Sequence, residues 1–181
     1  IESGYDLNPR TDWDNLATMV CFHGRYNLGD ADHGFNQADY NSFSELKKDI
    51  MRKNDVAVIL PLFLYDHSGI TMNTSGFSCS WDSGQVGYIF VTKDKVRSEY
   101  GIKRITAQWK ERITKYLEGE VETYDQYLTG DVYSFEIVKK ETCNLGCEHE
   151  EFEDSCGGFF GYDIKENGIL EHLSDEDREH M

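Results

Sequence analysis

The ten residues from Val56 to Tyr65 form the longest apolar run of the chain, and they constrain its fold more than any other feature. Both phases of the strand alternation are apolar, which is typical of a strand covered on both faces. Pro61 within the run predicts an edge position or a bulge, because proline cannot donate to a strand ladder. The run is shorter than the roughly 18 residues of a membrane helix, so we expect no membrane segment.

Helices and strands alternate around this run without a strand–helix–strand rhythm. Ser42 and Glu45 form a capping-box pattern that predicts a helix ending near Asn54. The spacing of apolar residues predicts further strands at Thr18–His23, Gln85–Thr92, Val132–Lys139 and Gly157–Tyr162. It also predicts helices at Lys93–Tyr100 and Ile105–Leu117, and the second of these helices continues through 118–128. The sequence predicts an α+β fold, with a mostly antiparallel mixed sheet and two or three helices. We expect a single α+β domain over 1–181, in which 141–181 is an acidic Cys-rich loop, a strand and a tail.

The chain is strongly acidic, and the acids are concentrated near its end. There are 34 Asp and Glu residues against 18 Lys and Arg, a formal net charge of −16, and residues 141–181 hold 13 acids against Lys165 and Arg178. A field of this sign repels nucleic acid and attracts basic surfaces, including those that hold nucleic acid. The alternative is that the charge only keeps the chain soluble.

Two groups of residues are candidates for binding such a partner. The first is acidic: Glu148, Glu150, Glu151, Glu153 and Asp154. The second combines acids with tyrosines, as interface anchors do: Glu122, Tyr124, Asp125 and Tyr127. The alternative for the second group is a helix that packs Tyr124 and Leu128 inward.

A basic stretch in the middle of the chain has two interpretations. Its residues are Lys103, Arg104, Lys110, Arg112 and Lys115. They could make a weak contact with a phosphate backbone. The other interpretation is a solvated helix face.

The five cysteines indicate a reducing, cytosolic compartment, because their number is odd and a chain of this length does not need a disulfide framework. Cys143, Cys147, His149 and Cys156 lie close together in sequence, but they lack the usual two-residue gaps of a zinc site. We expect no metal or cofactor there, although the spacing alone leaves metal binding open.

Asp66, His67 and Asp82 follow and precede predicted strands, where functional sites are often built. If they converge, they could bind a divalent metal or perform acid–base catalysis, which gives the alternative of a metal-dependent hydrolase. Ordinary turn hydrogen bonds also explain these residue types. The motifs of helical zinc proteases and of nucleophile elbows are absent, so we expect no enzyme activity.

Four blocks of sequence carry a resemblance to a known family. They are Phe77–Val91 (FSCSWDSGQVGYIFV), Val96–Gly101 (VRSEYG), Glu120–Tyr133 (EVETYDQYLTGDVY) and Asp154–Gly161 (DSCGGFFG). The chain resembles small proteins of phages and mobile elements of Gram-positive gut bacteria that are associated with anti-CRISPR inhibition of type II RNA-guided nucleases. The resemblance implies a non-enzymatic inhibitor that binds the nuclease–guide RNA complex and blocks DNA cleavage in the cytoplasm of an infected host. The nucleic-acid channels of such nucleases are strongly positive, which agrees with the acidic composition.

Overall fold

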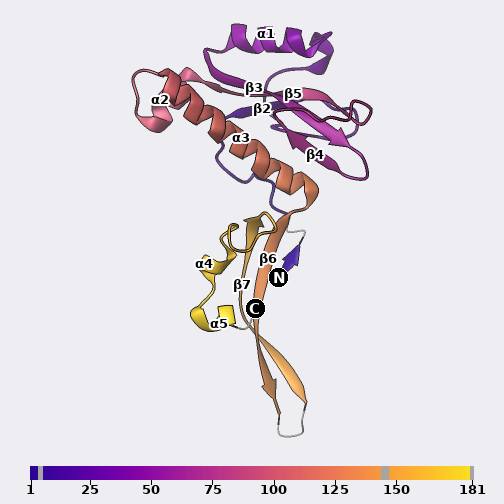
Figure 1. Ribbon diagram of the computed structural model, residues 1–181, viewed down its shortest axis with the longest axis vertical. Helices are drawn as coiled ribbons and strands as arrows, with labels where there is room; N and C mark the ends of the chain where they lie inside the picture. Colours follow the sequence, from indigo (N-terminus) through magenta and orange to yellow (C-terminus); the bar gives the residue numbers. More distant parts are fainter. Residues whose placement is uncertain (4–5, 144–146, 180–181) are drawn as a thin grey trace. The chain divides into compact units, whose positions relative to one another are not determined.

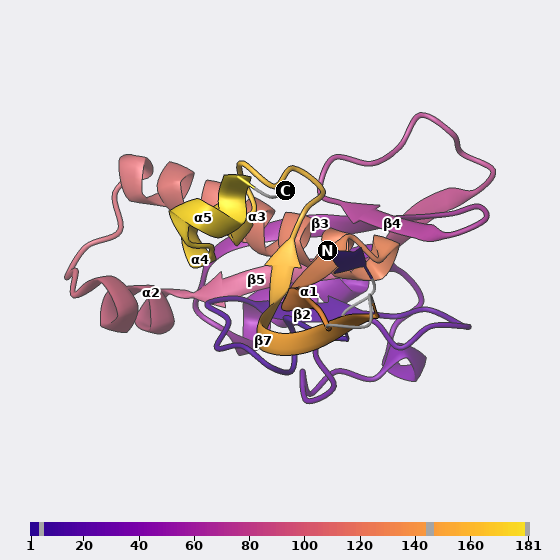
Figure 2. The same ribbon diagram turned by 90° about the horizontal axis from the view of Figure 1, so that it is seen from below.

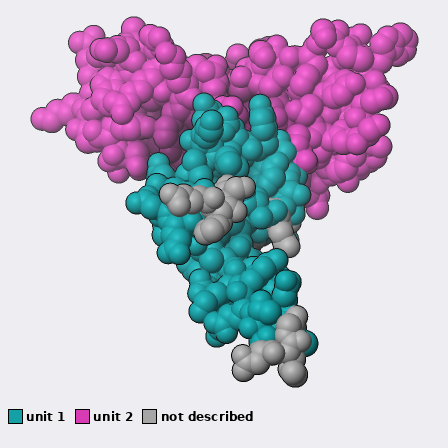
Figure 3. All heavy atoms as spheres, turned by 60° about the horizontal axis from the view of Figure 1, so that its bottom comes forward, with its two compact units in different colours: residues 1–7, 130–181 teal, residues 8–129 magenta. Residues whose placement is uncertain are grey.

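The computed structural model describes residues 1–3, 6–143 and 147–179. The chain divides into two compact units, shown in Figure 3: residues 8–129 form the larger one, and residues 1–7 with 130–181 form the smaller one. The fold is α+β with antiparallel strand pairing, as the sequence predicts. Within the described ranges, none of the helices is both long enough and apolar enough to span a membrane.

The larger unit is built on an antiparallel sheet with strand order β2-β5-β3-β4 (Figure 1). The strands are β2 (Thr18–Cys21), β3 (Val56–Asp66), β4 (Ile70–Asn73) and β5 (Ser83–Thr92). Pro61 pairs with Tyr88 of β5, and β4 joins the other side of β3 only from Phe63 onward. The proline therefore lies where that side of β3 is still unpaired, and a register shift follows between Leu62 and Phe63.

Helices cover both faces of this sheet, which is why β3 and β5 are apolar in both phases. The helices are α1 (Phe43–Lys53), α2 (Lys93–Tyr100) and α3 (Ala107–Thr129), and a short 3-10 turn covers Gln37–Asp39. On one face Leu46 and Ile50 of α1 pack with Tyr88 and Phe90. On the other face Ile113 and Leu117 of α3, together with Val121, pack with Met19, Leu62 and Ile89. Figure 1 shows α1 and α3 on opposite sides of the strands.

Helix ends follow the local sequence signals closely. The Ser42 side chain accepts a hydrogen bond from the Glu45 backbone at 3.3 Å, so the predicted cap of α1 is present. The Glu45 carboxylate reaches back to the Asn41 backbone at 2.9 Å instead of to the cap residue itself. Gly101 ends α2 with a φ of 62°, a left-handed conformation that favours glycine.

The smaller unit is a long antiparallel hairpin with a short third strand. Its strands are β1 (Glu2–Ser3), β6 (Val132–Thr142) and β7 (Glu148–Phe160), in the order β1-β6-β7. Two short helices follow, α4 (Ile169–His172) and α5 (Asp175–Glu179), and they are drawn beside the hairpin in Figures 1 and 2. Phe135, Phe159, Ile169 and Leu173 form a small core between the base of the hairpin and these helices.

The structure differs from the sequence-based expectation in this region. We expected an acidic loop before a strand at Gly157–Tyr162, whereas β7 already begins at Glu148. Glutamate has low strand propensity, so the segment does not read as a strand by itself. Pairing with β6 supplies the missing stabilisation, because Lys139 and Lys140 lie opposite Glu151 and Glu150. The expected tail contains α4 and α5.

A buried arginine connects the loops of the larger unit to α3. Arg10 is 7% exposed and donates to both carboxylate oxygens of Asp30, at 2.7 and 2.9 Å. It also donates to Glu120 of α3 at 2.9 Å and to the Ala17 carbonyl at 2.8 Å. The second Glu120 oxygen accepts from the Leu16 backbone at 2.8 Å. Each charge of this cluster is therefore both ion-paired and hydrogen-bonded, as burial requires.

Replacing Arg10 should destabilise the larger unit severely. In Arg10→Ala, Asp30 and Glu120 keep their charges without their partner, so we expect the free energy of unfolding to fall by about 3–5 kcal/mol in urea titrations. Arg52→Ala is the matched control, because Arg52 pairs with Asp49 at the surface and should contribute at most about 1 kcal/mol. A loss for Arg10→Ala no larger than that of the control would contradict the role of this cluster.

Two buried side chains of the larger unit, the Cys21 thiol and the Tyr124 hydroxyl, predict a loss of stability at high pH. Burial raises the pKa of the Cys21 thiol from 9.0 to about 12, and it raises the pKa of the Tyr124 hydroxyl from 10.0 to about 12. Their stabilising effect is complete below the unfolded pKa values and is lost as pH rises toward the folded ones. Over that pH range, each group lowers the free energy of unfolding by up to about 1.4 kcal/mol per pH unit.

The measurement is urea unfolding between pH 8 and 11 for wild type, Cys21→Ala and the exposed control Cys147→Ala. Stability of wild type and of Cys147→Ala should fall steeply above pH 9, and the slope for Cys21→Ala should be smaller. Equal slopes for all three proteins would show that the Cys21 thiol is not held neutral by burial.

Candidate functional site

The hairpin of β6 and β7 is strongly acidic. Residues 136–154 contain seven acids against Lys139 and Lys140. The predicted acidic group lies entirely on β7, and all of its members are exposed: Glu148, Glu150, Glu151, Glu153 and Asp154. The structure therefore brings the five acids of the first predicted group together on one strand.

Strand register divides the outer hairpin into two faces. Lys140 lies opposite Glu150 and Val138 lies opposite Phe152, which places these two pairs on one face. Lys139 opposite Glu151 lies on the other face. The register shifts between Ile137 and Val138, where β7 contributes one extra residue, Glu153.

Both lysines of the hairpin are already neutralised by local acids. Lys139 pairs with Glu141 at 2.9 Å, and Lys140 pairs with Glu150 at 3.3 Å. The hydrogen bond to Glu141 raises the pKa of Lys139, and the same bond lowers the pKa of Glu141. The acids left over, among them Glu148, Glu151 and Glu153, give the outer hairpin an unopposed negative field.

An apolar pair lies among these acids. Phe152 is 61% exposed, and Val138, directly opposite on β6, is 40% exposed. Exposed aromatic side chains in a charged surround are typical of interface anchors. The sequence analysis did not single out this pair. The signal was a phenylalanine between glutamates, but its partner becomes visible only once the register is known.

The second predicted group serves mainly the interior of the larger unit. Tyr124 is 2% exposed, stacks on Tyr127 and accepts a hydrogen bond from the Gly29 backbone at 3.0 Å. Asp125 accepts from the Met72 backbone at 2.6 Å. Glu122 is exposed on α3. We therefore correct the prediction for Tyr124: its side chain packs inward, which was the alternative, and it is not available to a partner.

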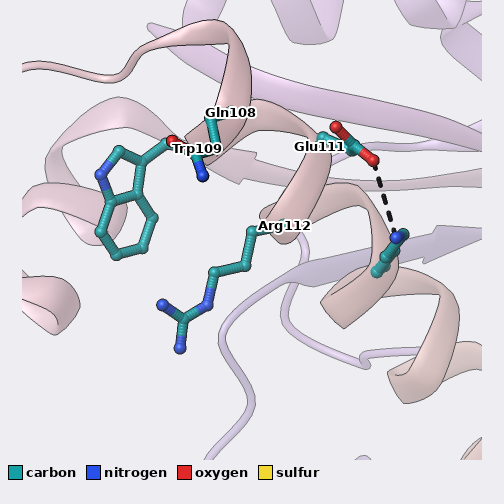
Figure 4. A pocket seen from close by; sticks show the side chains of 5 residues that line it. Gln108, Trp109, Glu111 and Arg112 are labelled. Atoms are coloured by element: carbon teal, nitrogen blue, oxygen red, sulfur yellow. Dashed lines mark ion pairs between the residues drawn. The ribbon is translucent and has the colours of Figure 1, made fainter.

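The basic stretch is exposed at the start of α3 and in the preceding loop. Its residues are Lys103, Arg104, Lys110, Arg112 and Lys115. Arg112 lies over the rings of Trp109 and Tyr100, at 5.1 and 5.6 Å from their centroids, and Lys115 pairs with Glu111. Figure 4 shows Trp109 and Arg112 at the edge of a cavity of about 430 Å³, with the Glu111 ion pair beside it. An arginine over partly buried rings that keeps its own exposure suits phosphate contact, and the rings hold it in place.

The structure does bring Asp66, His67 and Asp82 together. His67 Nδ1 lies 3.3 Å from Asp82 Oδ2, and the Asp66 backbone donates to the Asp82 carbonyl at 2.8 Å. The Asp66 carboxylate is paired with Arg25. A cavity of about 500 Å³ is lined by Asp66 and Asp82 but not by His67, and Trp81, which is 94% exposed, also lines it. The three residues, whose convergence the sequence left open, therefore lie close together, and Arg25 is a neighbour that sequence reasoning missed.

The cysteine cluster does not converge on one point. Cys143 and Cys147 face each other across the hairpin end, where the Cys143 backbone donates to the Cys147 carbonyl at 2.8 Å. Cys156 lies further along β7, about 30 Å away at the rise of an extended strand. Across the described ranges, no three His, Cys, Asp or Glu side chains are grouped so that they could hold a metal ion.

Comparisons with known proteins identify no relative. No protein-family model matches the chain, no curated protein matches it, and no solved structure resembles it. The functional argument therefore depends on the residues and their geometry.

Proposed function

We propose that this protein is a non-enzymatic, phage-type inhibitor that binds a type II CRISPR nuclease–guide RNA complex and blocks DNA cleavage. One observation carries the proposal: the acids of the hairpin stand exposed on β7 while both of its lysines are paired locally. The sequence blocks that resemble anti-CRISPR proteins support the choice of target.

The physical basis is competition for a positive channel. A type II nuclease holds its guide heteroduplex and its DNA in strongly basic grooves. An acidic ribbon is steered toward such a groove and competes with DNA for the same lysines and arginines. The Phe152–Val138 pair adds apolar contact once the ribbon is bound. The acids thus govern association, and the apolar pair governs dissociation.

The interface that we propose consists of Glu148, Glu150, Glu151, Glu153 and Asp154 on β7. Glu122 and Tyr127 on α3 are secondary candidates for the same partner. The basic residues around Arg112 provide a separate, weak contact with the guide RNA or DNA of the complex. The site of action is the cytoplasm of the bacterial host.

A cleavage assay tests the function directly. Purified protein is titrated against several type II nuclease–guide complexes, and preincubation times are varied. We expect inhibition that is complete near one inhibitor per complex and independent of preincubation and of chelators. No inhibition of any of the nucleases would exclude the proposal.

Charge reversal tests the hairpin. The variant Glu148→Lys, Glu150→Lys, Glu151→Lys, Glu153→Lys should associate with the nuclease complex at least tenfold more slowly at low salt, because steering is lost. For wild type the association rate should fall as salt rises, since the screening length shrinks to about 8 Å at physiological ionic strength.

The control variant carries the same change in charge elsewhere, at four exposed acids: Glu99→Lys, Glu118→Lys, Glu166→Lys and Glu171→Lys. Its association rate should stay within about threefold of wild type. Equal slowing in both variants would assign the effect to net charge and not to the hairpin.

The convergence of His67 and Asp82 favours a second candidate, a hydrolase that uses Asp66, His67 and Asp82. An imidazole held by a carboxylate is a usual acid–base pair. This candidate predicts inhibition that grows with preincubation at far below one protein per complex. It also predicts that the double variant Asp66→Asn, Asp82→Asn no longer suppresses DNA cleavage. The proposed inhibitor, in contrast, should suppress cleavage equally well with both changes.

A further inference from the structure

A cavity that the proposed function does not use lies beside α3 in the larger unit. Its volume is about 390 Å³, and its lining includes Trp13 of the N-terminal segment and Tyr116 of α3. These two residues are 45% and 48% exposed, so each is about half covered by the rest of the protein. A cavity with two half-exposed aromatic side chains in its lining suits a ligand that is itself flat and aromatic.

The same lining contains a glycine that the fold itself does not explain. Gly119 lies in the interior of α3, where glycine is less favourable than alanine. Its φ is not positive, so the helix does not need glycine for a left-handed conformation. A Cβ built on it would meet nothing within 4 Å in the described chain beyond its own stretch of helix, so close packing does not need glycine either. Open space at this position leaves room for a ligand that lies flat against the helix.

Positive charge adjoins the cavity along α3. Lys115 lines this cavity and also the cavity of about 430 Å³ shown in Figure 4, where Arg112 lies over Trp109. Lys115 pairs with Glu111 at 3.6 Å, but both side chains are 73% exposed. Such a surface ion pair is weak, so a phosphate can replace the glutamate. Further exposed cations of the same region are Lys103, Arg104 and Lys110.

Two acids also line the cavity, and one of them is already neutralised. Glu120 binds Arg10 at 2.9 Å and accepts a hydrogen bond from the Leu16 backbone at 2.8 Å. Asp14 is exposed, and a carboxylate can accept hydrogen bonds from the exocyclic amino groups of bases. The lining therefore offers a carboxylate for the edge of a base and a lysine for its phosphate.

We propose that this face of α3 binds single-stranded nucleic acid. A base lies in the cavity that Trp13 and Tyr116 line, flat against Gly119, and the adjoining phosphates contact Lys115 and Arg112. The inference extends the weak phosphate contact of the proposed function to the bases. It stands on α3 and the N-terminal segment alone, and its test needs no nuclease.

The geometry favours a single strand over two related ligands. A duplex keeps its bases stacked and paired, so it could reach the cations of α3 but not the aromatic cavity. A free nucleotide could fill the cavity, but it would leave most of the cations between Lys103 and Lys115 without a phosphate. The net charge of −16 for the whole chain opposes every nucleic acid equally and keeps the affinity modest.

The test measures binding of fluorescently labelled oligonucleotides to the full chain by anisotropy at low salt, where phosphate contacts are strongest. The probes are a single-stranded DNA of about twelve nucleotides, the duplex of the same sequence, and a labelled mononucleotide. We expect the single strand to bind at least tenfold more tightly than either of the others, and its affinity should fall as salt rises.

Gly119→Leu is the sharpest variant, because its side chain occupies the cavity while the helix is retained. Leucine has the higher helix propensity and its Cβ meets open space, so urea unfolding should show undiminished stability. Binding of the single strand should nevertheless weaken at least tenfold. Trp13→Ala should weaken it similarly, whereas the control Trp81→Ala removes a more exposed tryptophan outside the cavity and should change it less than threefold.

The inference is overturned if none of the probes binds, or if the duplex or the mononucleotide binds as tightly as the single strand. It is also overturned if Gly119→Leu is stably folded and binds like wild type, or if Trp13→Ala loses no more affinity than Trp81→Ala. The Trp13→Ala comparison decides alone if Gly119→Leu proves unstable. No nuclease is present in these titrations, so their outcome is distinct from that of the cleavage assay.

Discussion

The larger unit depends on one buried cation. Arg10 is held by Asp30 and Glu120, and these carboxylates in turn accept hydrogen bonds from the Met19 and Leu16 backbones. The N-terminal segment that contains Arg10 and Leu16 is thereby fixed to helix α3, although Glu120 of that helix lies about a hundred residues further along the chain. A buried charge tolerates only one arrangement of its partners, so the cluster specifies how the irregular N-terminal segment lies against α3.

The two units use their polar residues in opposite ways. In the larger unit, the carboxylates of Asp30, Glu120 and Asp125 accept hydrogen bonds from backbone amides, and the first two also bind Arg10. In the hairpin of the smaller unit, most acids are turned to solvent, and the apolar pair of Phe152 and Val138 is exposed with them. Side chains that do not stabilise their own fold are the ones free to bind a partner. This contrast, and not the total charge, is the reason why we propose the hairpin as the interface.

Periodic segments were predictable from the sequence, and long-range arrangements were not. The apolar run of β3, the cap at Ser42 and the continuous helix α3 follow from local patterns, and the structure confirms them. The strand at Glu148 was missed because its stability comes from β6 and not from its own residues. The Arg10 cluster was missed for the same reason, since nothing local marks Glu120 as its partner. The inward position of Tyr124 was open in the sequence, because tyrosine suits cores and interfaces equally.

The central claim is that the hairpin, and not the Asp66–Asp82 cavity, contacts the partner. Hydrogen–deuterium exchange of the chain alone and with a type II nuclease–guide complex measures this directly. Our account predicts slowed exchange at 136–142 and 148–155 in the complex, with residues 66–84 unchanged. Slowed exchange at 66–84 with an unchanged hairpin would contradict it.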